Sequence, residues 1–119
     1  MKKVIENGNV AVLYSPSYGA GWYTWNSSRS EDGEDALELI FDPTLVELVQ
    51  KKNSPDCINE TGFIHLIERR AHEISPMGYF AGAPTLDIEW IPIGTEFRIH
   101  EYDGYESIDY KEKLDWIKA

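Results

Sequence analysis

The sequence predicts an α+β fold in which an antiparallel sheet packs against two helices. Three features lead to this prediction: an apolar strand-like run near the N-terminus, two stretches in the middle that open with helix-start signals, and alternating residues near the C-terminus. The 119 residues suit one hydrophobic core. Residues 1–119 are therefore expected to form a single domain, whose sheet combines a C-terminal β-meander with an N-terminal strand.

Two strands are expected in the first third of the chain. Residues 9–14 (NVAVLY) follow Asn7-Gly8 and end at Ser15-Pro16, as a buried strand between turns does. Residues 37–41 (LELIF) are interpreted as a second strand. The connection between them is longer than an ordinary loop, and such loops are usually functional or disordered. Its many aromatic residues argue against disorder.

Two helices are expected next. Asp42 can cap a helix whose first residue is Pro43, and Ser54-Pro55 repeats this start signal. Residues 59–74 place five apolar side chains along one helical face, and Ser75-Pro76 ends the run. These five are Phe63, Ile64, Ile67, Ala71 and Ile74.

The C-terminal third is expected to form antiparallel strands. Residues 86–90 alternate between apolar and acidic, residues 91–94 suit a type I turn, and Asp103-Gly104 is a strong signal for a two-residue hairpin loop. The hairpin register predicts opposed residue pairs. They are Phe97 with Tyr110, Arg98 with Asp109, Ile99 with Ile108, and Glu101 with Glu106.

The opposed carboxylates of Glu101 and Glu106 leave two interpretations open. At an exposed hairpin tip their repulsion would be small and without consequence. Alternatively, the pair is held for a ligand hydroxyl, a cation or an arginine.

The charge of the chain limits its partners. A formal net charge of −10 at pH 7 argues against DNA or RNA polymers, because phosphate neutralisation needs clustered Lys and Arg. Three interpretations of the acidity remain: solubility, mimicry of a polyanion toward a basic partner, or a pocket that binds its ligand with rings and backbone N–H groups.

Sequence motifs do not support catalysis or metal binding. Cys57 stands alone, and His65 and His72 lie too far apart on a helix to share a metal ion. No serine elbow is present. No run approaches membrane-spanning length, and the N-terminus lacks an apolar signal region. We therefore expect a non-enzymatic cytoplasmic protein with no cofactor, no metal and no membrane partner.

Residues 17–26 (SYGAGWYTWN) combine four aromatic rings with two glycines. Glycines let backbone N–H groups approach an anion, and rings stack on bases with about 1–3 kcal/mol each. The same rings could instead form a small core under a loop, or a subunit interface. A homo-oligomer whose interface forms the pocket would satisfy both interpretations, and we expect one.

Three segments carry a resemblance to a known group of proteins. They are VAVLYSPSYGAGWYTWN (residues 10–26), LIFDPTLVELV (residues 39–49) and YFAGAPTLDIEWIPIGTEFRIHEYDGYESI (residues 79–108), and they resemble a family of small proteins encoded by bacteriophages and prophages. The resemblance implies an accessory protein in the cytoplasm of the infected bacterial host, of the class that counters host defence. It brings no catalytic residue.

The resulting hypothesis is a sponge that sequesters a nucleotide-derived immune signal, such as a cyclic nucleotide or an ADP-ribose-like molecule, without cleaving it. In this hypothesis Arg98 meets a phosphate, Asn26 reads a base edge and Glu101 accepts from a ribose hydroxyl. The stacking rings are Tyr18, Trp22, Tyr23 and Trp25, and the backbone N–H donors are Gly19 and Gly21. The alternative is an acidic inhibitor that binds a bacterial defence effector directly.

Overall fold

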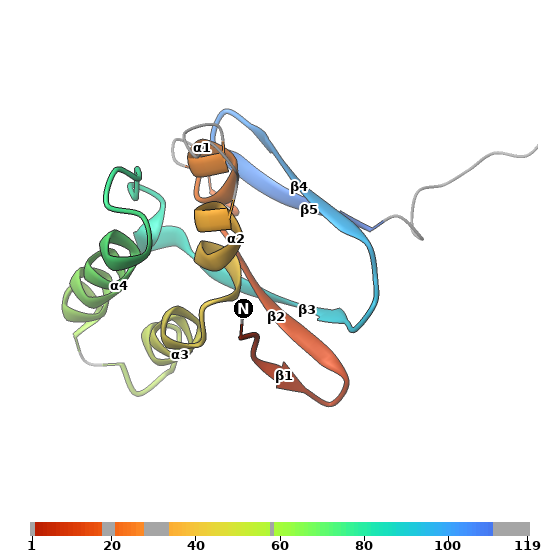
Figure 1. The fold of residues 1–119 in the computed structure, drawn as a ribbon. Helices are drawn as coiled ribbons and strands as arrows, with labels where there is room; N and C mark the ends of the chain where they lie inside the picture. Colours follow the sequence, from red (N-terminus) through yellow and green to blue (C-terminus); the bar gives the residue numbers. More distant parts are fainter. Residues whose placement is uncertain (1, 18–20, 28–33, 58, 111–119) are drawn as a thin grey trace, which may run out of the picture.

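The computed structural model describes residues 2–17, 21–27, 34–57 and 59–110, and it confirms the α+β class with antiparallel sheets (Figure 1). The elements are β1 (Ile5–Glu6), β2 (Asn9–Tyr14), α1 (Tyr23–Ser27), α2 (Glu34–Phe41), α3 (Pro43–Lys52), α4 (Glu60–Ile74), the 3-10 turn η1 (Ala83–Thr85), β3 (Asp87–Pro92), β4 (Phe97–Tyr102) and β5 (Tyr105–Tyr110).

Strand β2 is the middle strand of a three-stranded antiparallel sheet. β1 and β3 pair with its two sides, and β2 faces β3 along its whole length, with Tyr14 opposite Asp87. Asn7 and Gly8 form the turn between β1 and β2 with φ of 52° and 77°, as a type I′ turn requires. The Asn-Gly pair therefore makes a hairpin in addition to opening the predicted strand.

Strands β4 and β5 form a separate two-stranded sheet with the predicted hairpin. Asp103 and Gly104 make the turn with φ of 51° and 81°, and the predicted residue pairs are confirmed. The meander differs from the prediction because β3 pairs with β2 and not with β4. The turn after β3 spans Pro92 to Thr95, and Gly94 has a φ of 85°, which a type I turn does not contain.

The interpretation of residues 37–41 as a strand is wrong. They belong to α2, which buries Ala36, Leu39 and Ile40 at helical spacing while Leu37 and Glu38 face solvent. A run of five residues is too short for its period to separate a strand from a helix. The short helix α1, which lies within the expected long loop, was also not predicted.

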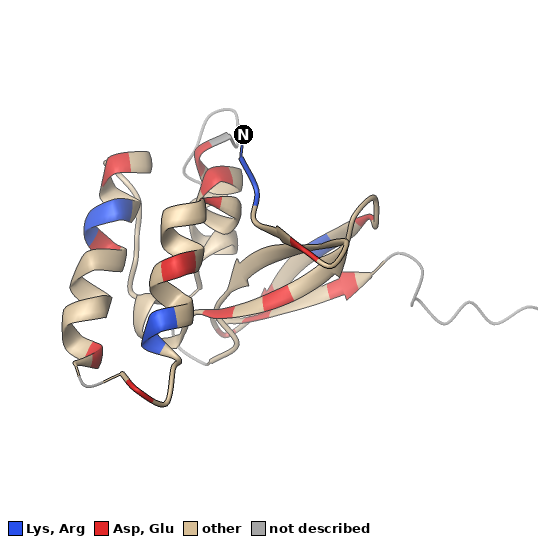
Figure 2. Cartoon of the chain, turned by 90° about the horizontal axis from the view of Figure 1, so that it is seen from below, with Lys and Arg blue, Asp and Glu red and all other residues tan. Residues whose placement is uncertain are grey.

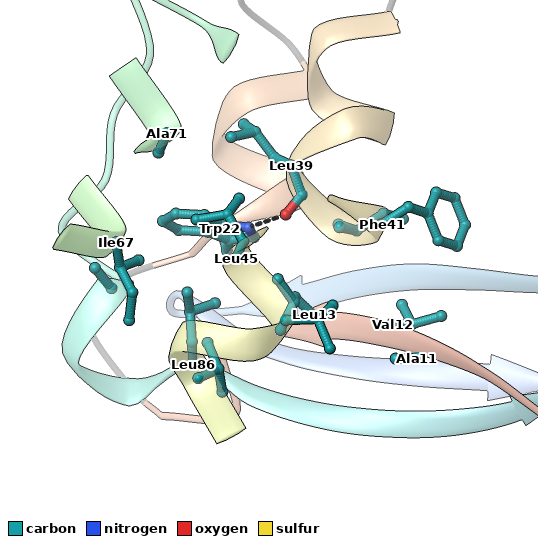
Figure 3. Packing of buried hydrophobic residues seen from close by; sticks show 14 of the residues in the cluster. Ala11, Val12, Leu13, Trp22, Leu39, Phe41, Leu45, Ile67, Ala71 and Leu86 are labelled. Carbon is teal, nitrogen blue, oxygen red and sulfur yellow. Dashed lines mark hydrogen bonds between the residues drawn. The ribbon is translucent and has the colours of Figure 1, made fainter. Parts of the chain in front are cut away.

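The core lies where the helices meet β2. Ala11, Val12 and Leu13 of β2 are fully buried and belong to one cluster with Trp22 and the helices (Figure 3). The helices contribute Leu39, Ile40, Leu45, Val46, Val49, Ile67 and Ala71.

Helix α3 begins as predicted. The Asp42 side chain accepts from the Leu45 backbone N–H at 3.0 Å, and the same carboxylate accepts from the Arg70 guanidinium of α4 at 2.8 and 3.0 Å. Hydrogen bonds to Asp42, and then to Glu73, raise the pKa of Arg70 above its ordinary value. One buried carboxylate thus caps α3 and joins it to α4.

Replacing Asp42 by alanine is expected to lower the free energy of unfolding by about 1–2 kcal/mol, because it removes the cap and the partner of Arg70. Asp42→Asn keeps a capping oxygen and should lose less. The midpoint of urea denaturation measures both variants. An unchanged midpoint in Asp42→Ala would contradict this account of the cap.

The β4–β5 hairpin is attached to the rest of the fold along one face. The Glu106 backbone N–H donates to the Ser15 carbonyl at 2.8 Å, and the Tyr110 hydroxyl donates to the Glu89 carboxylate of β3. In Figure 1 the hairpin lies beside α1, with which β4 is in contact. Its apolar side chains pack against the core, and they are Phe97, Ile99, Ile108 and Tyr110.

Candidate functional site

Trp22 lies inside the fold. Its side chain is 0% exposed, and its indole Nε1 donates to the Leu39 carbonyl at 2.9 Å (Figure 3). Its ring also lies 5.5 Å from the ring of Phe80. A ring enclosed in this way has no open face for a base. The stacking role predicted for Trp22 therefore does not fit its position, and a core role does.

Asn26 and Gly21 also serve the fold. The buried Asn26 amide donates to the carbonyls of Trp22 and Tyr79 at 2.6 and 2.8 Å, and its Oδ1 accepts from the Tyr79 N–H at 2.7 Å. These bonds attach α1 to the segment after α4 and occupy the amide that was predicted to read a base. A Cβ at Gly21 would lie 2.6 Å from the Trp25 ring, so this glycine permits close packing.

Tyr23 and Trp25 keep part of their surface exposed. Both are half-buried, and the Trp25 ring lies 5.2 Å from the Tyr79 ring. Tyr18 and Gly19 lie outside the described residues. Among the described rings of the aromatic segment, the stacking hypothesis therefore depends on Tyr23 and Trp25.

The hairpin has two faces, because residues alternate along a strand. Glu101, Glu106 and the apolar residues that pack on the core share the inner face. The opposite side, which we name the outer hairpin face, consists of Arg98, His100, Tyr102, Tyr105, Ser107 and Asp109.

Glu101 and Glu106 have separate hydrogen-bond partners. The Glu106 carboxylate is 0% exposed and accepts from the Ser15 N–H, the Thr24 N–H and the Thr24 hydroxyl, each at 2.8 Å. The Glu101 carboxylate accepts from the Gly104 N–H of its own turn at 2.6 Å. The exposed-tip interpretation is therefore wrong for Glu106, although the register that opposes the two residues is right.

Arg98 does not lie beside the aromatic segment. Its Nε is 3.4 Å from Asp109 Oδ2 on the outer hairpin face, whereas Thr24 of α1 binds Glu106 on the inner face. Because the strands separate the two faces, Arg98 and the rings of α1 do not line one pocket. The phosphate role predicted for Arg98 thus lacks stacking partners from α1.

His100, Ser107 and Asp109 are the residue types of a hydrolase triad. Ser107 Oγ lies 3.0 Å from His100 Nε2, and Asp109 Oδ2 lies 2.9 Å from the same nitrogen. In a triad the nucleophile and the carboxylate bind different ring nitrogens, so that one orients the base while the other gives up its proton. Both groups contact Nε2 here, and this geometry does not activate Ser107 as a nucleophile.

The sequence-based site did not include Tyr102 and Tyr105. They are 74% and 39% exposed and directly opposed beside the hairpin turn. Tyrosine and arginine are enriched in protein interfaces, where their large side chains contribute contact area and hydrogen bonds. The predicted register already placed both rings on one face with Arg98, so the alternation along the hairpin was the signal that could have found this face.

Another group of tyrosines lies where β3 meets the hairpin. Burial raises the pKa of Tyr14, and the charges of Asp87 and Glu89 raise it further. Burial, and then the hydrogen bond to Glu89, raise the pKa of Tyr110. Both phenols therefore keep their protons in the folded protein at a pH where an exposed tyrosine ionises.

Stability is expected to fall as pH rises above about 10. There the unfolded chain releases tyrosine protons that folded Tyr14 and Tyr110 retain, so the folded state binds more protons and the free energy of unfolding decreases. Burial lowers the pKa of Lys52, so this group makes the folded state more stable as pH rises. The effect of Lys52 is the same in the wild type and in the tyrosine variant. The fall in the urea midpoint between about pH 9 and about pH 11 should therefore be smaller in Tyr110→Phe than in the wild type. An equal decrease would contradict the prediction.

Among the described residues, hollows of about 400 to 440 Å³ lie beside α3 and α4, and their lining includes no predicted site residue. In one of them Lys52 is buried, with Nζ donating to the carbonyls of Pro84 and Leu86 at 3.0 and 3.1 Å. Within the described ranges, no group of three or more His, Cys, Asp or Glu could hold a metal ion. No helix in the same ranges is long and apolar enough to cross a membrane.

Charge is unevenly distributed over the described chain (Figure 2). Lys and Arg lie on the N-terminal segment, α3, α4 and β4, whereas Asp and Glu lie on β1, α2, α3 and α4 as well as on β3, β4 and β5. Arg98 is the one Lys or Arg of β3, β4 and β5. The strands with the exposed tyrosines therefore carry more acidic than basic side chains, of which Glu106 is buried and Asp109 is paired with Arg98.

Comparison with protein-family models, with curated proteins and with solved structures finds no match to this chain. The assignment of a function therefore depends on the geometry described above.

Proposed function

We propose that this chain is a non-catalytic binding protein that docks on a basic surface of a partner protein through its outer hairpin face. The observation that carries the proposal is the exposed, directly opposed pair Tyr102 and Tyr105. Both rings stand on a hairpin whose other face is attached to the core, so they are presented on a rigid support. Exposed rings on such a support lose little conformational entropy on binding.

The charges support a basic partner. The chain carries a formal net charge of −10, and Asp103 stands in the turn between the two tyrosines, directly after Tyr102. Complementary charge raises the association rate and disfavours acidic surfaces. In line with the resemblance to phage proteins, the proposed partner is a bacterial defence effector in the cytoplasm of the infected host.

The nucleotide-sponge hypothesis has less support. Trp22 and Asn26 are enclosed in the fold, and Arg98 lies on the opposite side of the hairpin from α1. A nucleotide needs a stacking ring and a phosphate partner in one place. The homo-oligomer remains a prediction, and the proposed docking does not require it.

The test is to express the chain in bacterial strains that each carry one defence system and to count phage plaques. We expect plating to recover in one strain. The effector of that strain should then co-elute with the chain in size-exclusion chromatography at low salt and separate from it at about 1 M salt. Recovery without co-elution, together with a nucleotide released from the heated protein, would favour the sponge. No recovery in any strain would contradict the counter-defence role.

A further inference from the structure

Glu106 joins three parts of the chain that are distant in sequence. Its Oε1 accepts from the Ser15 N–H directly after β2, and its Oε2 accepts from the N–H and hydroxyl of Thr24 in α1, each at 2.8 Å. The Glu106 backbone N–H also donates to the Ser15 carbonyl at 2.8 Å. One side chain of β5 thus binds both ends of the connection between β2 and α1.

Burying an ionised carboxylate is costly unless hydrogen bonds or a cation compensate it. Glu106 is 0% exposed, and no Lys, Arg or His of the described residues forms an ion pair with it. Its compensation comes from the three donors of Ser15 and Thr24. Hydrogen bonds to a charged acceptor are stronger than those between neutral groups.

A neutral side chain of the same shape cannot replace this carboxylate. A carboxylate accepts at both oxygens, whereas glutamine has one carbonyl and one NH₂ group that only donates. In Glu106→Gln the NH₂ group would face a donor, either the Ser15 N–H or the two donors of Thr24. One end of the connection would therefore lose its acceptor.

We propose that Glu106 is a positioning residue, a clasp that holds the two ends of the Ser15–Thr24 connection and the tip of the hairpin together. The hydrogen bonds of Ser15, of Thr24 and of the first residues of β5 then break and form together. The clasp also fixes the angle at which the outer hairpin face is presented, because Glu106 lies beside Tyr105 in β5. The clasp itself does not depend on the proposed function, since its test uses the free protein.

The test is amide hydrogen exchange followed residue by residue in the wild type, in Glu106→Gln and in the control Glu101→Gln. We expect Glu106→Gln to exchange the Ser15 and Thr24 amides faster by about tenfold or more, the loss expected for a hydrogen bond to a charged group. Val12 and Leu13 in the β2–β3 ladder should change much less. The control should leave Ser15 and Thr24 unchanged, because Glu101 binds Gly104. Equal acceleration of all amides would overturn the local clasp.

A milder variant keeps the proposal testable if Glu106→Gln does not fold. Thr24→Val removes one of the three donors and leaves the Thr24 N–H in place. The removed hydroxyl donates to Glu106 Oε2, whereas the Ser15 amide donates to Oε1. If the clasp joins both ends, this change should nevertheless accelerate exchange of the Ser15 amide as well. A Ser15 amide that exchanges at the wild-type rate in Thr24→Val would overturn the proposal.

Discussion

Trp22→Ala is expected to lower the free energy of unfolding by about 3–5 kcal/mol, a large part of the stability of a small domain. The ring is fully enclosed, so its removal leaves a cavity between α2 and the segment that contains Phe80. It also leaves the Leu39 carbonyl without the indole donor. Thermal and urea denaturation measure the loss, and we expect much of the variant to be unfolded or aggregated.

Trp22→Phe is the matched control. It keeps an aromatic ring in the core and removes the hydrogen bond to Leu39, so it should cost about 1–3 kcal/mol and remain folded. If Trp22→Ala melted at the wild-type temperature, the ring would not be a core residue, and the stacking hypothesis for this segment would regain its support.

Replacing Tyr102 and Tyr105 together by alanine is expected to abolish partner binding with a loss of stability much smaller than that of Trp22→Ala. Tyr102 is 74% exposed and its removal loses little packing, whereas Tyr105 is 39% exposed and its removal loses somewhat more. A central interface tyrosine typically contributes about 2 kcal/mol or more, which is roughly a 30-fold weakening for each residue. The dissociation constant for the effector, and the melting temperature of the same sample, measure the two effects.

Leu66→Ala provides the control for this double variant. Leu66 is an exposed apolar residue on α4, away from the hairpin, so its removal should change neither affinity nor melting temperature. An unchanged dissociation constant in the double variant would exclude the two tyrosines as anchors. A fall in melting temperature as large as that of Trp22→Ala would mean that the rings support the hairpin and not a partner.

Local signals predicted much of the fold. The Asp42 cap, the helix over residues 59–74 and the hairpin at Asp103-Gly104 each depend on residues near one another in sequence, and the structure confirms them. The strand interpretation of residues 37–41 failed because packing against β2 selects the helical face of Leu39 and Ile40. The pairing of β3 with β2 is also a long-range choice, and turn signals do not encode it.

The candidate site was harder to predict because tertiary packing decides whether an aromatic ring is buried or exposed. Trp22 and Trp25 lie in the same segment, yet one is enclosed and the other is half-buried. Glu106 looked like an exposed tip residue, and its burial depends on Ser15 and Thr24, which are distant in sequence. By contrast, side chains alternate between the two faces of the hairpin, and this alternation would have placed Tyr102 and Tyr105 on the same face as Arg98.

The most direct test of binding through the outer hairpin face is to record amide chemical shifts of the isotope-labelled protein while the effector found by plaque counting is added. Our account predicts the largest changes along the outer hairpin face, at Arg98, His100, Tyr102, Tyr105 and Ser107, with residues 21–26 changing little. Changes concentrated at residues 21–26, with the hairpin unaffected, would contradict it.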